Sequence, residues 1–205
     1  KAVFGFLLAL AIIVSLWIIT PPLVATNVPP IAPDAATPAD FGLTAREVRF
    51  AAADGVDLWA YYVPSQNGAA VVLRHGSSST AEDALPQAAV LARHGYGVLV
   101  TDARGHGRSA GRAMDFGWYG DADIAEAVAF LAAQPDVTGK IAVMGLSMGG
   151  EEALGAAGSN PSIAAVVAEG ATGRTDADKV WLADLYGWRG VFGTPTFFVG
   201  AEMFW

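Results

Sequence analysis

The segment IAVMGLSMGGEEALGAAG, residues 141–158, restricts the fold more strongly than any other part of the sequence. Its apolar start is typical of a buried strand, whereas the small residues after Ser147 are typical of a helix. The two parts meet in the elbow, residues 145–149, where glycines on both sides of the serine let strand and helix approach closely. A strand that passes directly into a helix is the repeating unit of mostly parallel sheets.

Strand and helix patterns alternate along most of the remaining chain. The runs at 46–53 and 56–63 flank Asp54-Gly55, a hairpin turn signal, and are expected to pair antiparallel. Further strands are predicted at 69–75, 95–102, 140–145 and 162–170, and helices at 80–94, 121–134 and 148–158. This order predicts an α/β fold with a mostly parallel sheet of six strands and helices on both faces.

Residues 2–19 form an apolar run without a charge, in which Ser15 is the only polar side chain. A helix of that length spans about 27 Å, close to the ~30 Å hydrocarbon thickness of a bilayer. We therefore expect residues 1–25 to be a transmembrane anchor. A signal peptide cleaved near Leu23-Val24-Ala25 is the alternative, and a buried helix of a soluble protein is a third interpretation.

The flanks of this run indicate how the chain is organised around it. Lys1 precedes the run and no Lys or Arg recurs before Arg46, which predicts a cytoplasmic N-terminus and a globular domain outside the cytoplasm. The proline-rich residues 26–40 are predicted to be an extended, semi-rigid linker. The globular pattern covers residues 41–170.

Composition argues against several classes of protein. The net charge is −8 and no cluster of Lys or Arg occurs, so a nucleic-acid surface is not expected. The chain contains no cysteine, and its three histidines, His75, His94 and His106, form no pair at metal-ligand spacing. We therefore predict no metal and no organic cofactor, and the oligomeric state stays open.

Ser147 is the candidate nucleophile, because the G-x-S-x-G pattern between a strand and a helix raises the serine hydroxyl above the edge of the sheet. Gly145 and Gly149 leave room for that strained turn. The helix that follows contributes partial positive charge and free N–H groups. The N–H of Met148 is expected to point at the oxygen that becomes negative during acyl transfer.

Two polar loops follow predicted strands and are expected beside this serine. In the HGSS loop, residues 75–78, the backbone N–H of Ser77 or of its neighbour Gly76 or Ser78 is the candidate second oxyanion donor, and His75 is expected to brace the loop rather than act as a base. In the DARGHGRS loop, residues 102–109, the glycines permit a compact turn. We expect Asp102, Arg104 and His106 to have structural roles next to the site.

The motifs HGSSS, DARGHGRS and GLSMGG, in this order, resemble those of the α/β-hydrolase superfamily, in particular the bacterial serine-aminopeptidase-like and lipase- or esterase-like members, some of which are membrane-anchored. The resemblance covers residues 41–170. It implies a serine nucleophile, an acid and a histidine base in that chain order. It also assigns Ser147 as nucleophile, Met148 as the first oxyanion amide and Ser77 as the second.

The chain departs from this family pattern in its base, because no histidine follows Ser147. The resemblance places the usual acid after a seventh strand and the histidine after an eighth, whereas the pattern here stops at six. Glu169 at the end of the sixth strand is a minority candidate for the acid. We therefore expect the histidine, and with it the acid, in a C-terminal portion outside these 205 residues, without which the chain is expected to be inactive.

Residues 171–205 are rich in aromatic side chains and are expected either to begin a cap over the site or to pack against further strands. The resulting prediction is a membrane-tethered serine hydrolase that cleaves an ester, thioester or peptide/amide bond, with small acyl esters favoured over peptides. A non-catalytic, membrane-bound hydrolase-like binding module is the alternative. A cofactor-free haloperoxidase or a lyase on the same scaffold stays open, since fold does not fix the reaction.

Overall fold

The computed structural model describes residues 2–25, 27–114 and 117–171. The described chain divides into two units. The first contains helix α1 (Ala2–Ala25), in which the stretch Val3–Thr20 has a mean hydropathy of 2.7. Among the described helices, α1 is the one long and apolar enough to cross a membrane, and a signal peptide near the N-terminus has the same two properties.

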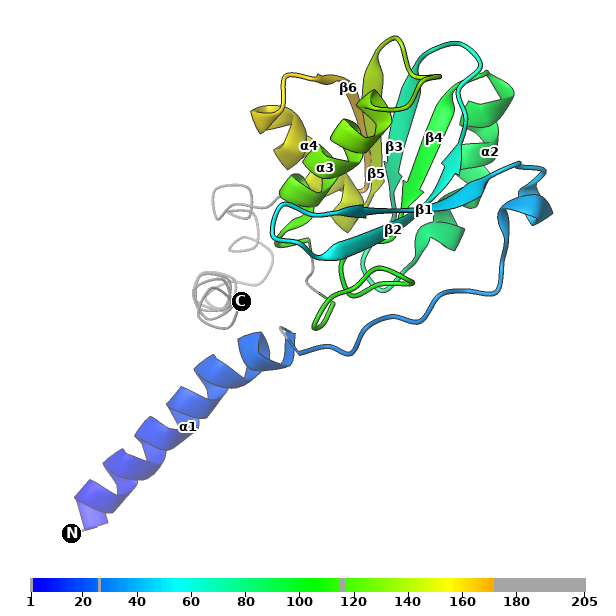
Figure 1. Ribbon diagram of the computed structural model, residues 1–205. Helices are drawn as coiled ribbons and strands as arrows, with labels where there is room; N and C mark the ends of the chain where they lie inside the picture. Colours follow the sequence, from blue (N-terminus) through cyan, green and yellow to red (C-terminus); the bar gives the residue numbers. More distant parts are fainter. Residues whose placement is uncertain (1, 26, 115–116, 172–205) are drawn as a thin grey trace. The chain divides into compact units, whose positions relative to one another are not determined.

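The second unit, which begins at Pro29, is built on a six-stranded sheet with the order β1-β2-β4-β3-β5-β6 (Figure 1). β1 pairs antiparallel with β2, and β2 pairs antiparallel with β4, whereas all remaining neighbours are parallel. The hairpin and the mostly parallel sheet are as predicted. The strands are β1 (Arg46–Ala51), β2 (Asp57–Val63), β3 (Ala70–Arg74), β4 (Gly97–Thr101), β5 (Ile141–Leu146) and β6 (Ile163–Glu169).

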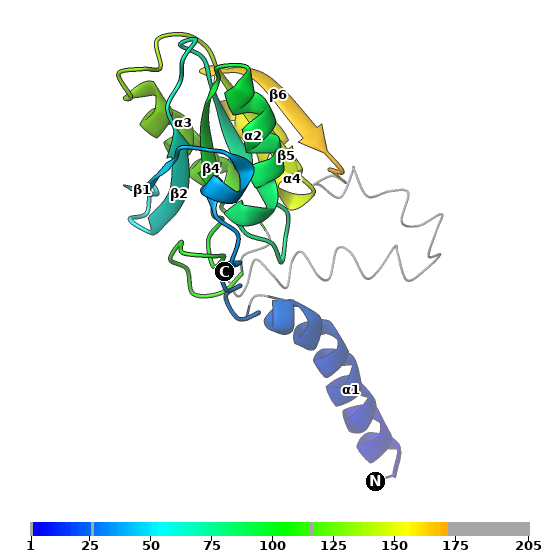
Figure 2. The ribbon, with the colours of Figure 1, turned by 90° about the vertical axis from the view of Figure 1, so that its right-hand side faces the viewer.

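Helices cover both faces of this sheet (Figure 2). Helix α2 (Leu85–Arg93) packs on one face, where Trp59, Tyr61, Leu73 and Val100 are buried around Leu85 and Ala88. Helices α3 (Gly120–Ala132) and α4 (Met148–Ser159) pack on the other face. Neighbouring strand residues alternate between the two clusters, as the two-residue period of a strand requires.

The helix predicted at 80–94 begins later in the structure than its sequence pattern suggested. Residues Ala81–Ala84 form a 3₁₀ turn, η2, and the regular helix α2 starts at Leu85, directly before Pro86. Proline lacks a backbone N–H and fits only the first turn of a helix, so Pro86 explains this start.

The proline-rich segment contacts the sheet unit well before the 3₁₀ turn η1 (Pro38–Phe41). The N–H of Ile31 donates to the Gly105 carbonyl over 2.9 Å, and the N–H of Gly107 donates to the Ile31 carbonyl over 2.8 Å. Ile31 thereby forms a parallel β-bridge with His106. This part of the predicted linker is therefore a structural element of the second unit.

Candidate active site

Ser147 lies at the junction of β5 and α4 in a conformation that few residues other than glycine adopt. Its φ and ψ angles are 52° and −116°, and only Ser78 shares a positive φ among the described non-glycine residues. The Ser147 N–H donates to the Glu169 carbonyl over 2.7 Å, and its carbonyl accepts from the N–H groups of Gly150 and Glu151. The residue is exposed. Such strain, held by surrounding hydrogen bonds, is typical of functional positions.

The glycines of the elbow are required by close backbone contacts. A Cβ atom on Gly145 would lie 1.9 Å from the Gly149 carbonyl oxygen, and a Cβ atom on Gly149 would lie 2.5 Å from the His75 carbonyl oxygen. Both distances are far below van der Waals contact. The sequence pattern therefore reflects the close packing of β5, α4 and the end of β3.

The HGSS loop lies directly against Ser147. A Cβ atom on Gly76 would stand 3.2 Å from the Ser147 Cβ and 3.9 Å from its Oγ. Met148 is the first residue of α4, where an N–H has no acceptor inside the helix. Within the part of the chain that the structure describes, the Ser77 N–H likewise donates to no carbonyl. The loop and the helix start, which carry the two predicted oxyanion donors, thus flank the same hydroxyl.

His75 is fully buried, and the backbone occupies both of its ring nitrogens. Nε2 accepts from the Ala103 N–H over 2.9 Å, so Nδ1 carries the proton and donates to the Gly76 carbonyl over 2.6 Å. Burial, and after it the Arg74 and His106 charges, lower the pKa of His75 well below its ordinary value. His75 therefore braces the HGSS loop as a neutral imidazole.

His106 is also buried, with its ring centroid 4.9 Å from that of His75. Its Nδ1 donates to the Arg104 carbonyl over 2.8 Å, and Nε2 has no partner among the described residues. Burial lowers the pKa of His106 to about 4. His94 follows α2 and comes shortly before β4. It therefore lies at the amino-terminal ends of the parallel strands, whereas Ser147 lies at their carboxyl-terminal ends. Within the described residues, neither His75 nor His106 hydrogen-bonds to Ser147.

Asp102 organises the DARGHGRS loop. Its Oδ1 accepts from the Ala81 N–H over 2.7 Å, and its Oδ2 accepts from the Arg108 N–H over 2.8 Å. Burial raises the pKa of Asp102 to about 6 despite these two donors. Gly107 packs so closely on this carboxylate that a Cβ would lie 2.0 Å from Oδ2. The loop is compact because its glycines and its buried acid fit together.

Arg104 belongs to a buried ion network. Its guanidinium donates to both oxygens of Asp123, at 2.8–3.0 Å, and to both oxygens of Asp54, at 2.6 and 2.8 Å. Asp123 is in the first turn of α3 and Asp54 is in the hairpin turn. Arg104 therefore ties the DARGHGRS loop to two other elements.

Sequence reasoning missed a second arginine of this network. Arg74, the last residue of β3, donates from Nε to the Glu152 Oε2 over 2.6 Å and lies 3.8 Å from Asp123. The Arg74 and Glu152 side chains are 2% and 0% exposed. A signal did exist for Arg74, because it is a charge at the end of an apolar strand pattern, whereas Glu152 follows a second acid, Glu151, and does not stand out.

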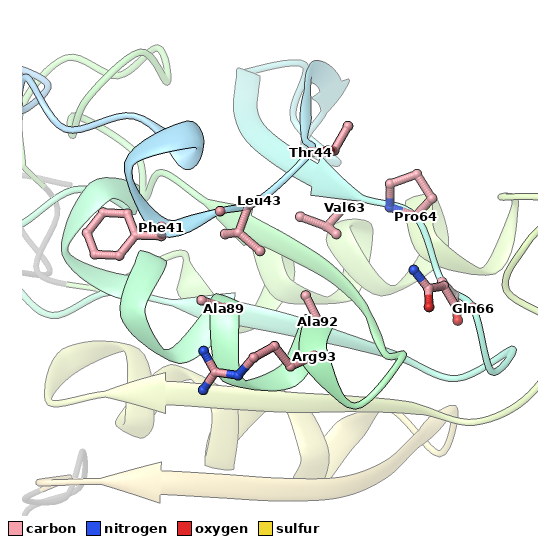
Figure 3. A pocket seen from close by; sticks show the side chains of 11 residues that line it. Phe41, Leu43, Thr44, Val63, Pro64, Gln66, Ala89, Ala92 and Arg93 are labelled. Carbon is pink, nitrogen blue, oxygen red and sulfur yellow. The ribbon is translucent and has the colours of Figure 1, made fainter.

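The structure also contains a pocket of about 560 Å³. It lies near the end of β2 and the start of β4, and so at the opposite ends of the strands from Ser147. Figure 3 shows Phe41, Leu43 and Val63 facing Ala89 and Ala92 of α2. None of the predicted site residues lines it, so it does not belong to the candidate site.

Some predictions fall outside the described chain or find no support in it. The segment 171–205 is expected either to begin a cap or to pack against further strands, and all of it except residue 171 lies outside the described residues. Glu169 is exposed at the end of β6, and its carbonyl, rather than its carboxylate, contacts the elbow. Within the described ranges, no group of three or more His, Cys, Asp or Glu residues is arranged to hold a metal ion.

Comparison with known proteins extends these observations. The family model described as serine aminopeptidase, S33, matches residues 65–192, more than half of the chain. The structure of the Pyrococcus furiosus esterase Pf2001 superposes with a TM-score of 0.67 at 26% identity, over 82% of this chain and 69% of that one.

Two curated proteins are similar in sequence. The thiohydrolase aneE of Aspergillus aculeatus is 36% identical over 120 residues, which cover 56% of this chain and 37% of that protein. The uncharacterized protein YqkD of Bacillus subtilis is 30% identical over 109 residues, or 53% of this chain and 36% of that protein. The matched region thus spans little more than a third of either relative.

Proposed function

The chain belongs to the serine aminopeptidase, S33, family of α/β-hydrolases, and from this premise we propose that it is a serine hydrolase whose nucleophile is Ser147. One observation carries the proposal. The exposed Ser147 stands in a strained conformation at the start of α4, with the glycine-containing HGSS loop packed against it. Strain of this kind costs on the order of 1–3 kcal/mol and clusters at active sites, which supports a functional role for Ser147.

The proposed reaction proceeds through an acyl-enzyme. The Ser147 Oγ attacks the substrate carbonyl carbon while its proton passes to a base, and the carbonyl oxygen becomes an oxyanion held by the Met148 and Ser77 N–H groups. The leaving group departs with a proton returned by the base. Water then attacks the acyl carbon and gives a proton to the base; the bond to the Ser147 Oγ breaks, the base returns the proton to Oγ, and the acid product leaves. In this proposal the base is a histidine outside these 205 residues, because no histidine follows Ser147 and the Nδ1 atoms of His75 and His106 donate to backbone carbonyls.

For the substrate, we infer a small acyl ester or thioester rather than a peptide. The named relatives support this choice, since one is an esterase and another a thiohydrolase.

We also propose that α1 remains as an anchor and holds the hydrolase unit outside the cytoplasm. Its length and apolar composition support the anchor, and Lys1 before it with no further Lys or Arg until Arg46 supports the side. Retention of the protein in membrane pellets after alkaline carbonate washing, together with protease access from the outer side, tests the anchor separately from the chemistry.

The test of the chemistry is covalent labelling of the full-length protein with a fluorophosphonate probe. Labelling of the wild type that disappears in Ser147→Ala is the expected result, because the phosphonate forms a stable adduct with an activated serine. Hydrolysis of p-nitrophenyl acetate should be lost in parallel. A folded wild type that takes up no label would contradict the proposal and favour the non-catalytic binding module.

A further inference from the structure

We propose that Arg74, through its buried ion pair with Glu152, is a positioning residue for the oxyanion hole; this inference rests on the proposed function. Arg74 is the last residue of β3 and directly precedes the HGSS loop, which contains Ser77. Glu152 is in the second turn of α4, the helix that begins at Met148. The ion pair therefore joins the two backbone segments that carry the proposed oxyanion donors.

The Arg74 side chain is held from several directions. Besides the 2.6 Å contact with Glu152, its Nη1 donates to the Asp102 carbonyl at 3.2 Å and to the Thr101 hydroxyl at 3.3 Å. Its aliphatic part passes the elbow so closely that a Cβ on Gly149 would lie 2.8 Å from the Arg74 Cγ. The Arg74 side chain thus connects the elbow to β3 and β4 through its positive charge and several donors, of which a lysine would keep the charge but not every donor.

The signs of the buried charges give this arrangement a testable asymmetry. Without Arg74, the carboxylates of Glu152 and Asp123 remain buried near the elbow with less compensation. The extra negative charge repels the oxyanion that forms at the Met148 and Ser77 N–H groups, and so raises the energy of the transition state. Glu152→Gln instead removes a negative charge and keeps an oxygen that accepts from the Arg74 Nε. If the ion pair only stabilised the fold, the variants of Arg74 and of Glu152 would show no such difference in kcat.

The experiment compares Arg74→Met, Arg74→Lys, Glu152→Gln and the double variant Arg74→Met/Glu152→Gln in the full-length protein. We expect Arg74→Met to lower kcat for p-nitrophenyl acetate about 30-fold with KM within about 3-fold, and to slow fluorophosphonate labelling in parallel. Arg74→Lys should recover to within about 5-fold of wild type, and Glu152→Gln should lose less than about 5-fold. The double variant should be faster than Arg74→Met alone, because it also removes the negative charge of the buried carboxylate that has lost its arginine.

Arg49→Met is the matched control, since it removes an arginine whose ion pair with Asp57 is about half exposed and lies on the hairpin. It should leave kcat unchanged. Circular dichroism verifies that each variant is folded. If Arg74→Met does not fold, Arg74→Lys decides, because it should still lower kcat measurably at constant KM; a wild-type kcat overturns the inference.

The two proposals fail in different ways. A wild type without Ser147-dependent labelling removes the proposed function, and the positioning role with it. A wild type with Ser147-dependent labelling, combined with a folded Arg74→Met that turns over as fast as wild type or no slower than Glu152→Gln, removes the positioning role alone.

Discussion

Gly145 and Gly149 lie so close together that a Cβ atom on Gly145 would stand 1.9 Å from the Gly149 carbonyl oxygen. This contact brings the end of β5 against the first turn of α4. The conformation of Ser147 between them follows from it, because the chain has to reverse within very few residues. Because this contact leaves no room for a side chain at Gly145, its importance can be measured as the loss of unfolding free energy when one is added.

Gly145→Ala should destabilise the protein by more than about 3 kcal/mol, because backbone atoms rather than a flexible side chain occupy the space of the new methyl group. Gly158→Ala in α4 is the control. No atom lies within 4 Å of its added Cβ, so a gain of about 0.5–1 kcal/mol is expected from the better helix propensity. Urea denaturation followed by tryptophan fluorescence measures both. Equal stability of the two variants would contradict the packing described for the elbow.

Ser147→Gly should stabilise the protein relative to Ser147→Ala by about 1 kcal/mol, since glycine tolerates the φ of 52° and alanine does not. Both variants should take up no fluorophosphonate. The thermal midpoints of the two variants test the stability difference. A less stable glycine variant would mean that the strain at this residue is absent.

Gly76→Ala should slow fluorophosphonate labelling about 10-fold with little loss of stability, because the added methyl group would stand 3.2 Å from the Ser147 Cβ and narrow the approach to its hydroxyl. Gly139→Ala is equally crowded, at 3.2 Å from the Gly68 carbonyl oxygen, but lies just before β5, at the end of that strand away from Ser147. Labelling kinetics of the two variants should therefore diverge; equal rates would argue against the HGSS loop as a wall of the site.

The stability of the protein should fall as the pH drops from about 6.5 towards 4, in part because of His106. Burial lowers its pKa in the folded state to about 4 from the ordinary 6.5, so the unfolded state binds the proton first and is favoured in this range. The full contribution is about 3 kcal/mol. His75 acts in the same direction, whereas Asp102, whose pKa is raised to about 6, acts in the opposite one.

His106→Gln isolates this contribution, because His75 and Asp102 are present in both proteins. Unfolding free energies measured in urea at pH 7 and pH 5 should differ less for the variant than for the wild type. The same difference in both proteins would show that His106 is not protected from protonation in the folded state.

Periodicity and turn signals predicted the sheet, its hairpin and the elbow correctly, because alternating apolar residues and paired glycines act locally. The ion network of Arg74, Asp123 and Glu152 was not predicted. Arg74 and Glu152 are 78 positions apart, and no local pattern tells which distant charge a buried charge will meet. The bridge at Ile31 was missed for a related reason, since a proline-rich segment has no period that indicates a partner.

That bridge determines where a soluble version of the protein should begin. The proline-rich stretch looks dispensable, and a cloning boundary at residue 40 would remove it together with α1. Such a design would remove the hydrogen bonds that Gly105 and Gly107 make with Ile31, and with them the bridge beside the buried His106. A protein that starts at or before Pro29 keeps the bridge between Ile31 and His106, and expression trials should use such a start.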